Sequence, residues 1–355
     1  MKTQMKIITA LAIALAFMGG VPTVKGQEEV WRIGPRTLPV PVDVSGVMRE
    51  SLLKTPVPDV EAAKKAAPQT KEQWKAWISD GAAQAAPGAR ALAKQLSVAV
   101  KQERVAGVNV YRVTPSEIDP KHKNHLFIYL HGGAYVRNGG EAGTGEAVLI
   151  AARCKMPVLS VDYRMPPEHP APAAIDDVVT VWTQLLKDWR STSLALGGTS
   201  AGGGLTLASI HRFKELGLDL PGALYVGTPG ADITKTGDSR YINEGIDRTL
   251  VTWDGIVTQA LSMYAGGYDH KHPYVSPIYG NFEGFPPSYL ISGTRDLLLS
   301  DTVRVHRKLR AAGVDADLHV YEGQSHGDYA FVMNSPESRE HYAELNVFLL
   351  KHLQR

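Results

Sequence analysis

The stretch Gly198–Gly202, with the sequence GTSAG, fits the pattern G-x-S-x-G, in which a serine sits on a tight turn between a strand and a helix. Residues 194–196 before it form an apolar run, and residues 201–216 after it have the pattern of a helix that Gly217 ends. Glycines on both sides let the backbone turn where a Cβ would collide. The Ser200 hydroxyl would then lie beside the free amides of a helix N-terminus, which favour a developing negative charge. Five residues alone also fit an ordinary Gly/Ser turn, so the rest of the chain has to decide.

Strand-like and helical patterns alternate along most of the chain. Apolar or β-branched runs typical of strands cover residues 97–101, 105–113, 126–130, 157–161, 194–196, 223–226, 289–291 and 317–321. Helical stretches cover residues 145–152, 172–186, 201–216, 303–312 and 337–353. The first two runs indicate a hairpin. The alternation that follows predicts an α/β fold with a mostly parallel, eight-stranded sheet and helices on both faces.

The part of the chain before this sheet has a different composition. Residues 27–60 are rich in proline and valine and have the character of an extended arm with one short helix. Residues 61–96 are rich in alanine, and Pro68 and Pro87 are expected to break them into two or three short helices. The pattern predicts a helical layer that packs on the core or covers a pocket.

A long segment also interrupts the alternation near the middle of the sheet. Residues 231–287 lie between two predicted strands, and a connection of this length in a compact fold is usually functional. We therefore expect an N-terminal cap segment over residues 27–96. A catalytic domain over residues 97–355 would carry a second cap segment near residues 231–287.

The first 26 residues have the features of a secretory signal peptide. Lys2 and Lys6 precede an apolar run over residues 7–18, and cleavage is expected near the Gly26–Gln27 bond. The run is shorter than the roughly 20 residues that span a bilayer, so a stable membrane anchor is not expected. This pattern predicts a periplasmic or secreted protein.

Composition excludes several function classes. The 355-residue chain has a net charge of +2, and loss of the three lysines among residues 1–26 would leave −1. A near-neutral protein lacks the basic surface that nucleic acids need. Cys154 is the only cysteine, so no disulfide within the chain and no cysteine metal site is expected. No sequence feature calls for a metal or cofactor, and the sequence leaves a homodimer open.

An acid and a base follow the serine in the order that α/β-hydrolases use. Asp296 comes directly after the strand that ends at residue 291, and His326 follows the strand that ends at residue 321. Catalytic groups in such sheets gather at the carboxyl ends of the strands. The rival acid Asp301 fits better as the cap of the next helix, and Asp328 is too close to His326 to orient its ring. His306 and His319 are expected to have structural roles.

A fourth motif follows the strand over residues 126–130. His131, Gly132, Gly133 and Ala134 match loops of the HGGG type, which supply oxyanion-hole amides together with the amide after the nucleophile, here Ala201. His131 is expected to orient this loop rather than to transfer protons.

The chain resembles the hormone-sensitive-lipase-like branch of the α/β-hydrolases, especially its bacterial esterases. The resemblance depends on residues 131–134, on Asp162–Pro170 with the sequence DYRMPPEHP, and on residues 198–203. It implies an α/β-hydrolase fold with a helical cap, carboxylic-ester hydrolysis, and a structural role for the DYR run. Ala134 stands where the family usually has a third glycine, and Thr199 where many members have aspartate. The first change is expected to be silent unless the backbone there needs a positive φ.

These observations predict a serine carboxylesterase that hydrolyses short- to medium-chain esters through an acyl-enzyme. Ser200 would be the nucleophile, His326 the base, and Asp296 the group that orients it. A lactone hydrolase or an esterase for bulky or aromatic esters would use the same residues. A ligand-binding protein on an inactive hydrolase scaffold is the alternative from another class, and retention of all three residues argues against it.

Overall fold

The computed structural model describes residue 34 and residues 37–354, and the predicted signal peptide over residues 1–26 lies outside this part. The chain divides into two compact units, residues 1–39 and residues 40–355, and every helix and strand below belongs to the second. Within the described part, no helix is both long and apolar enough to cross a bilayer.

One eight-stranded sheet forms the centre of the second unit, as predicted. Its order is β1-β2-β4-β3-β5-β6-β7-β8, with β1 and β2 antiparallel to their neighbours and the other strands parallel. The strands are β1 (Val98–Val105), β2 (Val108–Pro115), β3 (Leu126–Leu130), β4 (Val158–Val161), β5 (Leu194–Thr199), β6 (Ala223–Gly227), β7 (Ser288–Gly293) and β8 (Ala316–Tyr321). Every residue of β3 to β7 is buried, which explains their continuous apolar sequences.

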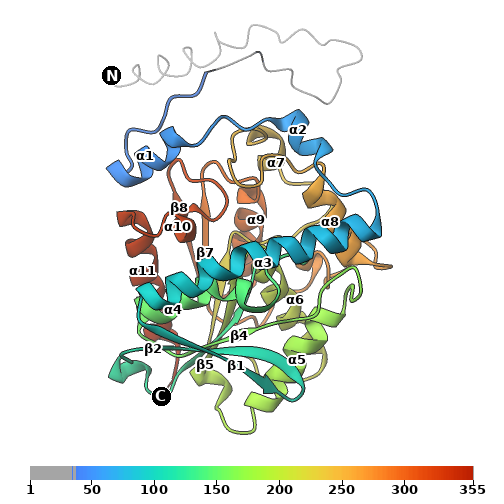
Figure 1. Cartoon of the computed structure of the whole chain (residues 1–355). Helices are drawn as coiled ribbons and strands as arrows, with labels where there is room; N and C mark the ends of the chain where they lie inside the picture. The colour runs from blue at the N-terminus through green and yellow to red at the C-terminus, as the bar shows by residue number, and fades with distance from the viewer. Residues whose placement is uncertain (1–33, 35–36, 355) are drawn as a thin grey trace, which may run out of the picture. The chain divides into compact units, whose positions relative to one another are not determined.

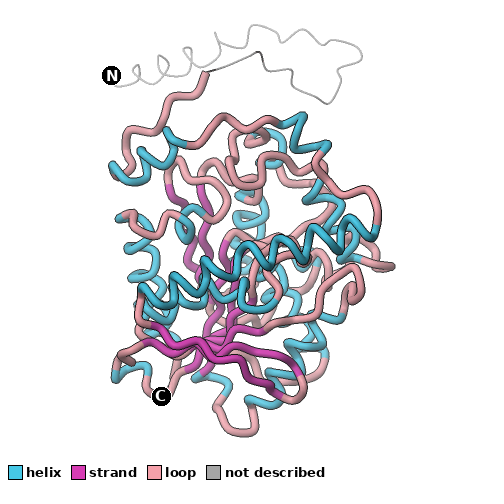
Figure 2. The backbone as a smooth tube through the Cα atoms, viewed as in Figure 1, coloured by secondary structure: helices cyan, strands magenta, loops and turns pink. Residues whose placement is uncertain are grey.

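Helices cover both faces of this sheet, and Figure 2 shows them around the strands. Side chains of β3 alternate between two cores: Ile128 packs with one and Phe127 with the other. The first core includes α5 (Ala173–Leu185), α6 (Ala201–Glu215) and α9 (Leu299–Ala311). The second includes α4 (Gly145–Cys154), α10 (Asp328–Phe331) and α11 (Pro336–His352).

The hairpin begins and ends at different residues than predicted. Val105 was expected to open the second strand, but β1 continues through it and pairs it with Val108. The turn is the pair Ala106-Gly107, and both residues have positive φ, at 48° and 90°. Two residues of this kind match the right-handed twist of the strands, so the turn position follows from backbone conformation rather than from the apolar pattern.

The helices before the sheet are α1 (Gly46–Lys54), α2 (Val60–Lys65) and α3 (Lys71–Gln95), and α3 contacts α4 and β1 (Figure 1). Pro68 lies between α2 and α3, but the expected break at Pro87 was wrong, because α3 continues through it. A capping box at Thr70 starts α3, and buried residues anchor it on both sides of the proline. Pro87 and Ala83 both lie on the exposed side, so the Ala83 carbonyl that loses its donor can bond to water.

The segment between β6 and β7 contains two α-helices, α7 (Ser239–Ile242) and α8 (Ile256–Ala265), and one short 3-10 helix, η4 (Pro277–Tyr279). Most of it is irregular, yet many of its side chains are buried, including Trp253 and Tyr264. Tyr264 stacks on Tyr135 with ring centroids 3.6 Å apart. The segment therefore packs against the loop that follows β3.

Candidate active site

Ser200 lies on a sharp turn between β5 and α6. Its φ of 63° and ψ of −122° are rare for a residue with a side chain. Its amide donates to the Gly227 carbonyl at 2.8 Å, and its own carbonyl accepts from the amides of Gly204 and Gly230 at 3.0 Å each. The turn is thus fixed by backbone hydrogen bonds to neighbouring elements.

The glycines of the GTSAG stretch allow this turn to approach β3. A Cβ on Gly198 would lie 2.0 Å from the Leu130 oxygen, and one on Gly202 would lie 1.9 Å from the same atom. Such distances leave no room for any side chain, so the sequence at both positions is dictated by packing.

Asp296 and His326 lie in contact with each other. Asp296 follows β7, His326 follows β8, and the Asp296 Oδ1 atom lies 3.1 Å from the His326 Nδ1 atom. Both side chains are buried. Since the two strands are parallel neighbours, their carboxyl ends bring together residues that are thirty positions apart.

Other groups also hold the Asp296 carboxylate. The Leu298 amide donates to Oδ1 at 2.7 Å, and the Ser292 hydroxyl donates to Oδ2 at 3.1 Å. The Thr228 hydroxyl donates to Oδ2 as well and lies 3.3 Å from His326 Nδ1. Thr228 and Ser292 were missed by the sequence analysis. Thr228 directly follows β6, the strand next to β7, and its place after a buried strand is the signal by which the sequence could have indicated it.

The electrostatics suit His326 as a base. Burial alone would lower the pKa of His326, but the charge of Asp296 and its hydrogen bond, aided by Asp247 and Asp328, raise that pKa above the ordinary 6.5. A raised pKa means that the imidazolium is stabilised, as a proton-accepting base requires.

The loop after β3 contains three of the backbone amides that the sequence predicts for an oxyanion site. Gly133 has a φ of 115°, and a Cβ on Gly132 would lie 2.8 Å from the Thr199 oxygen. Ala134 has a φ of 52°, so the backbone here does need the positive φ that favours the glycine usual in the family. Among the residues that the structure describes, none accepts a hydrogen bond from the amides of Gly132, Gly133, Ala134 or Ala201.

His131 and the DYR run support this loop. The His131 ring stacks on Tyr163 with centroids 4.1 Å apart, and the Tyr163 hydroxyl donates to the His131 carbonyl at 2.6 Å. Asp162 accepts from the Gly140 amide at 2.7 Å. Burial lowers the pKa of His131, so the ring is neutral near pH 7. These contacts fit an orienting role for His131.

Ser200 and His326 open onto one cavity of about 530 Å³. Gly132, Gly133, Ala134 and Ala201 line the same cavity. Its aromatic and aliphatic lining residues are Trp77 from α3, Tyr129 from β3, Leu250, Trp253, Ile256, Val257 and Leu261 from the segment between β6 and β7, Leu298, and Phe331 from α10. Helix α3, the segment between β6 and β7 and the loops that carry Ser200 and His326 therefore line one chamber.

Thr199 connects the serine turn to a buried carboxyl group. Its hydroxyl donates to the Glu146 Oε1 atom at 2.7 Å, and Tyr225 donates to the same oxygen at 2.8 Å. Tyr129 donates to the other oxygen at 2.8 Å. Burial raises the pKa of Glu146, although these three hydroxyls oppose the shift. The polar network ends at the residue before Ser200.

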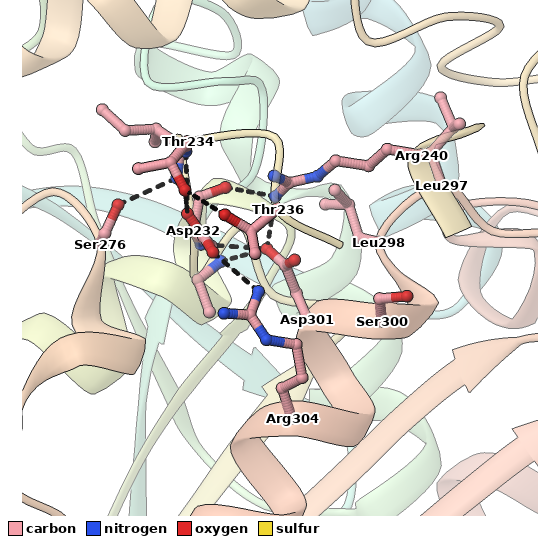
Figure 3. A network of polar contacts seen from close by, with 12 residues as sticks. Asp232, Thr234, Thr236, Arg240, Ser276, Leu297, Leu298, Ser300, Asp301 and Arg304 are labelled. Atoms are coloured by element: carbon pink, nitrogen blue, oxygen red, sulfur yellow. Dashed lines mark hydrogen bonds and ion pairs between the residues drawn. The ribbon is translucent and has the colours of Figure 1, made fainter. Parts of the chain in front are cut away.

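The other acids and histidines that the sequence offered as candidates have partners of their own. The prediction that Asp301 caps a helix was wrong. Asp301 lies within the first turn of α9 and pairs with the buried Arg240 at 2.7 Å (Figure 3). Asp328 pairs with Arg248 at 2.9 Å. His319 stacks on Tyr289, and His306 lies 3.2 Å from the Ala316 carbonyl oxygen. Among the described residues, no group of three or more His, Cys, Asp or Glu side chains is placed to hold a metal ion.

Comparisons with known proteins agree with this geometry. A sequence family described as having the alpha/beta hydrolase fold matches residues 127–330. The crystal structure of the esterase E25 is 54% identical, covers 92% of this chain and all of its own, and superposes with a TM-score of 0.90. An esterase from the bacterial hormone-sensitive lipase (HSL) family is 28% identical, covers 87% and 99%, and has a TM-score of 0.71. An acetyl-hydrolase of Streptomyces hygroscopicus is 28% identical over 68% of this chain and 81% of its own.

Proposed function

Because the chain belongs to the bacterial hormone-sensitive-lipase family of α/β-hydrolases and is a carboxylic-ester hydrolase, we propose that Ser200 is its nucleophile. The Ser200 oxygen attacks the ester carbonyl while His326 takes the hydroxyl proton. His326 then gives this proton to the departing alcohol, which leaves an acyl-enzyme. Water, deprotonated by His326, releases the acid and restores the serine.

Asp296 and the oxyanion amides have supporting roles in this proposal. Asp296 fixes the ring of His326 and stabilises its cation. The amides of Ala201 and of Gly132, Gly133 or Ala134 stabilise the negative oxygen of the tetrahedral intermediate, which is commonly the largest single contribution to such catalysis. The observation that carries the proposal is the 3.1 Å contact between Asp296 and His326 beside the chamber that Ser200 lines.

The substrates that we propose are short- to medium-chain esters. A chamber of about 530 Å³ is in the range of ordinary small-molecule sites, and its apolar lining suits an acyl or alcohol group of modest size. The name of the Streptomyces acetyl-hydrolase supports a small acyl group. Trp77, Trp253 and Phe331 in the lining favour aromatic esters or lactones as a second candidate class. p-Nitrophenyl esters of increasing acyl length, together with phenyl acetate and a lactone, would rank these classes by kcat/KM.

The serine mechanism is tested with Ser200→Ala. We expect this variant to lose nearly all turnover of p-nitrophenyl acetate and all labelling by a fluorophosphonate probe. Ser191→Ala is a matched control, because this serine lies in the short turn before β5, at the end of the strand opposite to Ser200. A Ser200→Ala protein with wild-type turnover would overturn the proposal, and a wild-type protein that neither turns over nor labels would indicate a ligand-binding scaffold.

We also propose that the protein is exported, on the basis of the residue 1–26 pattern alone. Mass spectrometry of protein from a bacterial periplasm or culture medium should find a mature chain that begins near Gln27. An intact N-terminus in a cytoplasmic fraction would contradict export.

A further inference from the structure

One short stretch between β6 and β7, residues 239–248, contacts the loops that carry both Asp296 and His326. We call it the clamp segment; it consists of α7 and the turn that follows. The loop of the acid covers residues 294–298, and the loop of the base covers residues 324–328. Both loops follow strands of the sheet, but several of their polar groups bond to the clamp segment rather than to the sheet.

Asn243 holds one side of the acid loop. Its side-chain amide donates to the Asp296 carbonyl at 2.9 Å and to the Thr294 carbonyl at 3.2 Å. Asn243 is buried and so is its bond to the Asp296 carbonyl, so that oxygen depends on Asn243 rather than on bulk water. Both N–H groups of the side-chain amide thus donate to backbone oxygens of the acid loop.

Asp247 holds the other side of the same loop. Its Oδ2 atom accepts from the Leu297 amide at 2.9 Å, and its Oδ1 atom accepts from the amides of Thr249 and Leu250 at 2.8 and 3.0 Å. Asp247 is fully buried. Asn243 and Asp247 therefore bind the backbone of Asp296 and of its neighbour, while the Asp296 side chain faces His326.

Arg248 connects the clamp segment to the base loop. Its backbone amide donates to the Ser325 hydroxyl at 3.1 Å, and its guanidinium lies 2.9 Å from Asp328 Oδ1. The Ser325 amide in turn donates to Asp328 Oδ2 at 2.7 Å. Both sides of His326 are thus tied to the residue that follows Asp247.

The chain next to the clamp segment forms part of the chamber wall. Leu250 and Trp253 line the chamber, and the Arg240 guanidinium from α7 packs on the Trp253 ring at 3.7 Å. Arg240 also pairs with Asp301 at the start of α9, and Figure 3 shows this pair beside Leu297 and Leu298 of the acid loop. The substrate wall and the acid loop therefore share one support.

We propose that Asn243 and Asp247 are positioning residues, which keep the Asp296 carboxylate aligned with His326 through the backbone of the acid loop. The proposal assumes the Ser200, His326 and Asp296 mechanism above. It gives the segment between β6 and β7 a role in the rate of the reaction in addition to its role as a wall. Displacement of a catalytic group by about 1 Å commonly costs about 100-fold in rate, so loss of these anchors acts on kcat.

The test measures kcat and KM of Asn243→Ala with p-nitrophenyl acetate. We expect kcat to fall 10- to 100-fold with KM within threefold of wild type. Glu244→Ala is the matched control: this neighbouring side chain bonds Thr252 and lies 3.6 Å from Lys64, away from the acid loop, and its loss should leave kcat within twofold. If Asn243→Ala does not fold, Asn243→Ser, which keeps one donor, should fold and show a smaller fall in kcat.

A double variant separates positioning from general loosening. Asp296→Ala alone is expected to lower kcat by more than 100-fold. If Asn243 acts through Asp296, then adding Asn243→Ala to that variant should change kcat by less than twofold. The positioning role would be overturned if the losses in kcat of the two single variants multiply in the double variant. It would also be overturned if Asn243→Ala or Asn243→Ser keeps wild-type kcat while Asp296→Ala is impaired. A fully active Asp296→Ala protein would instead overturn the assignment of the acid.

Discussion

The replacement Gly202→Ala tests the packing that fixes the turn of Ser200. Gly202 lies in the first turn of α6, against the end of β3. A Cβ at this position would lie 1.9 Å from the Leu130 oxygen, 2.7 Å from the Leu130 carbonyl carbon and 2.9 Å from the His131 oxygen. All three are backbone atoms of a central strand and the loop after it, so no side-chain rotation can relieve the overlap.

The size of the effect follows from these distances. Carbon and carbonyl oxygen rarely approach closer than about 3.3 Å, so the start of α6 would have to move away from β3 by more than about 1 Å. Overpacking of a close-packed core costs about 1–3 kcal/mol, and the rigid surroundings place this site at the upper end, near about 3 kcal/mol of unfolding free energy. The same movement shifts the Ala201 amide relative to Gly132 and Gly133, and a shift of about 1 Å should lower kcat/KM by about 100-fold.

Urea unfolding followed by tryptophan fluorescence and steady-state kinetics with p-nitrophenyl acetate would measure the two effects. Gly88→Ala is the matched control, because Gly88 lies inside α3 and an added Cβ there meets no atom within 4 Å. Alanine is the better helix former, so this control should gain about 0.5–1 kcal/mol of stability at unchanged kcat/KM. The reasoning fails if Gly202→Ala unfolds within 1 kcal/mol of wild type and keeps kcat/KM within fivefold.

Further predictions concern the acid, the oxyanion loop and the thiol. In the proposed mechanism His326 must be neutral to accept the proton. Burial lowers the pKa of His326, but Asp296 raises it above 6.5 overall, so kcat/KM should fall as the pH drops through this pKa, and Asp296→Asn should move this limb to lower pH. Thr228→Val removes a donor to the buried Asp296 carboxylate and should cost about 1.5–3 kcal/mol in urea unfolding, whereas an unchanged midpoint would contradict that bond. Ala134→Gly relieves a left-handed backbone with φ of 52° and should raise the unfolding free energy by up to about 1 kcal/mol; a loss would show that the alanine methyl packs usefully. Burial raises the pKa of the Cys154 thiol to about 12, so the folded protein should resist Ellman's reagent at pH 8 and the urea-unfolded chain should react with one equivalent.

The sheet and the groups at its carboxyl edge could be predicted because their signals are local. A buried parallel strand is a short apolar run, and the residues that follow it fall at one edge of the sheet. Ser200, Asp296 and His326 each follow such a run, so the sequence could predict that they lie at one edge of the sheet. The distances between their side chains depend on strand register, which the apolar runs do not encode.

Other features depend on partners that are distant in the sequence. Pro87 was expected to end a helix because its local effect is unfavourable, yet packing on both sides keeps α3 continuous. Thr228 and Asn243 were not recognised because a threonine or asparagine in an irregular segment has no distinctive pattern. Their importance comes only from the buried carboxylate and carbonyls that they reach in the folded chain.

Asp296 and Asp301 show how such partners decide function. Both carboxylates are fully buried and lie five residues apart, so burial does not distinguish them. Asp301 is bound to the buried cation of Arg240 and accepts from the amides of Ala231 and Asp232, so its charge is already neutralised. Among the described residues, no lysine or arginine forms an ion pair with Asp296, and the donors around it are neutral hydroxyls and one amide. In the proposed mechanism its charge therefore remains available to the imidazolium that forms on His326, as the acid of a serine hydrolase requires.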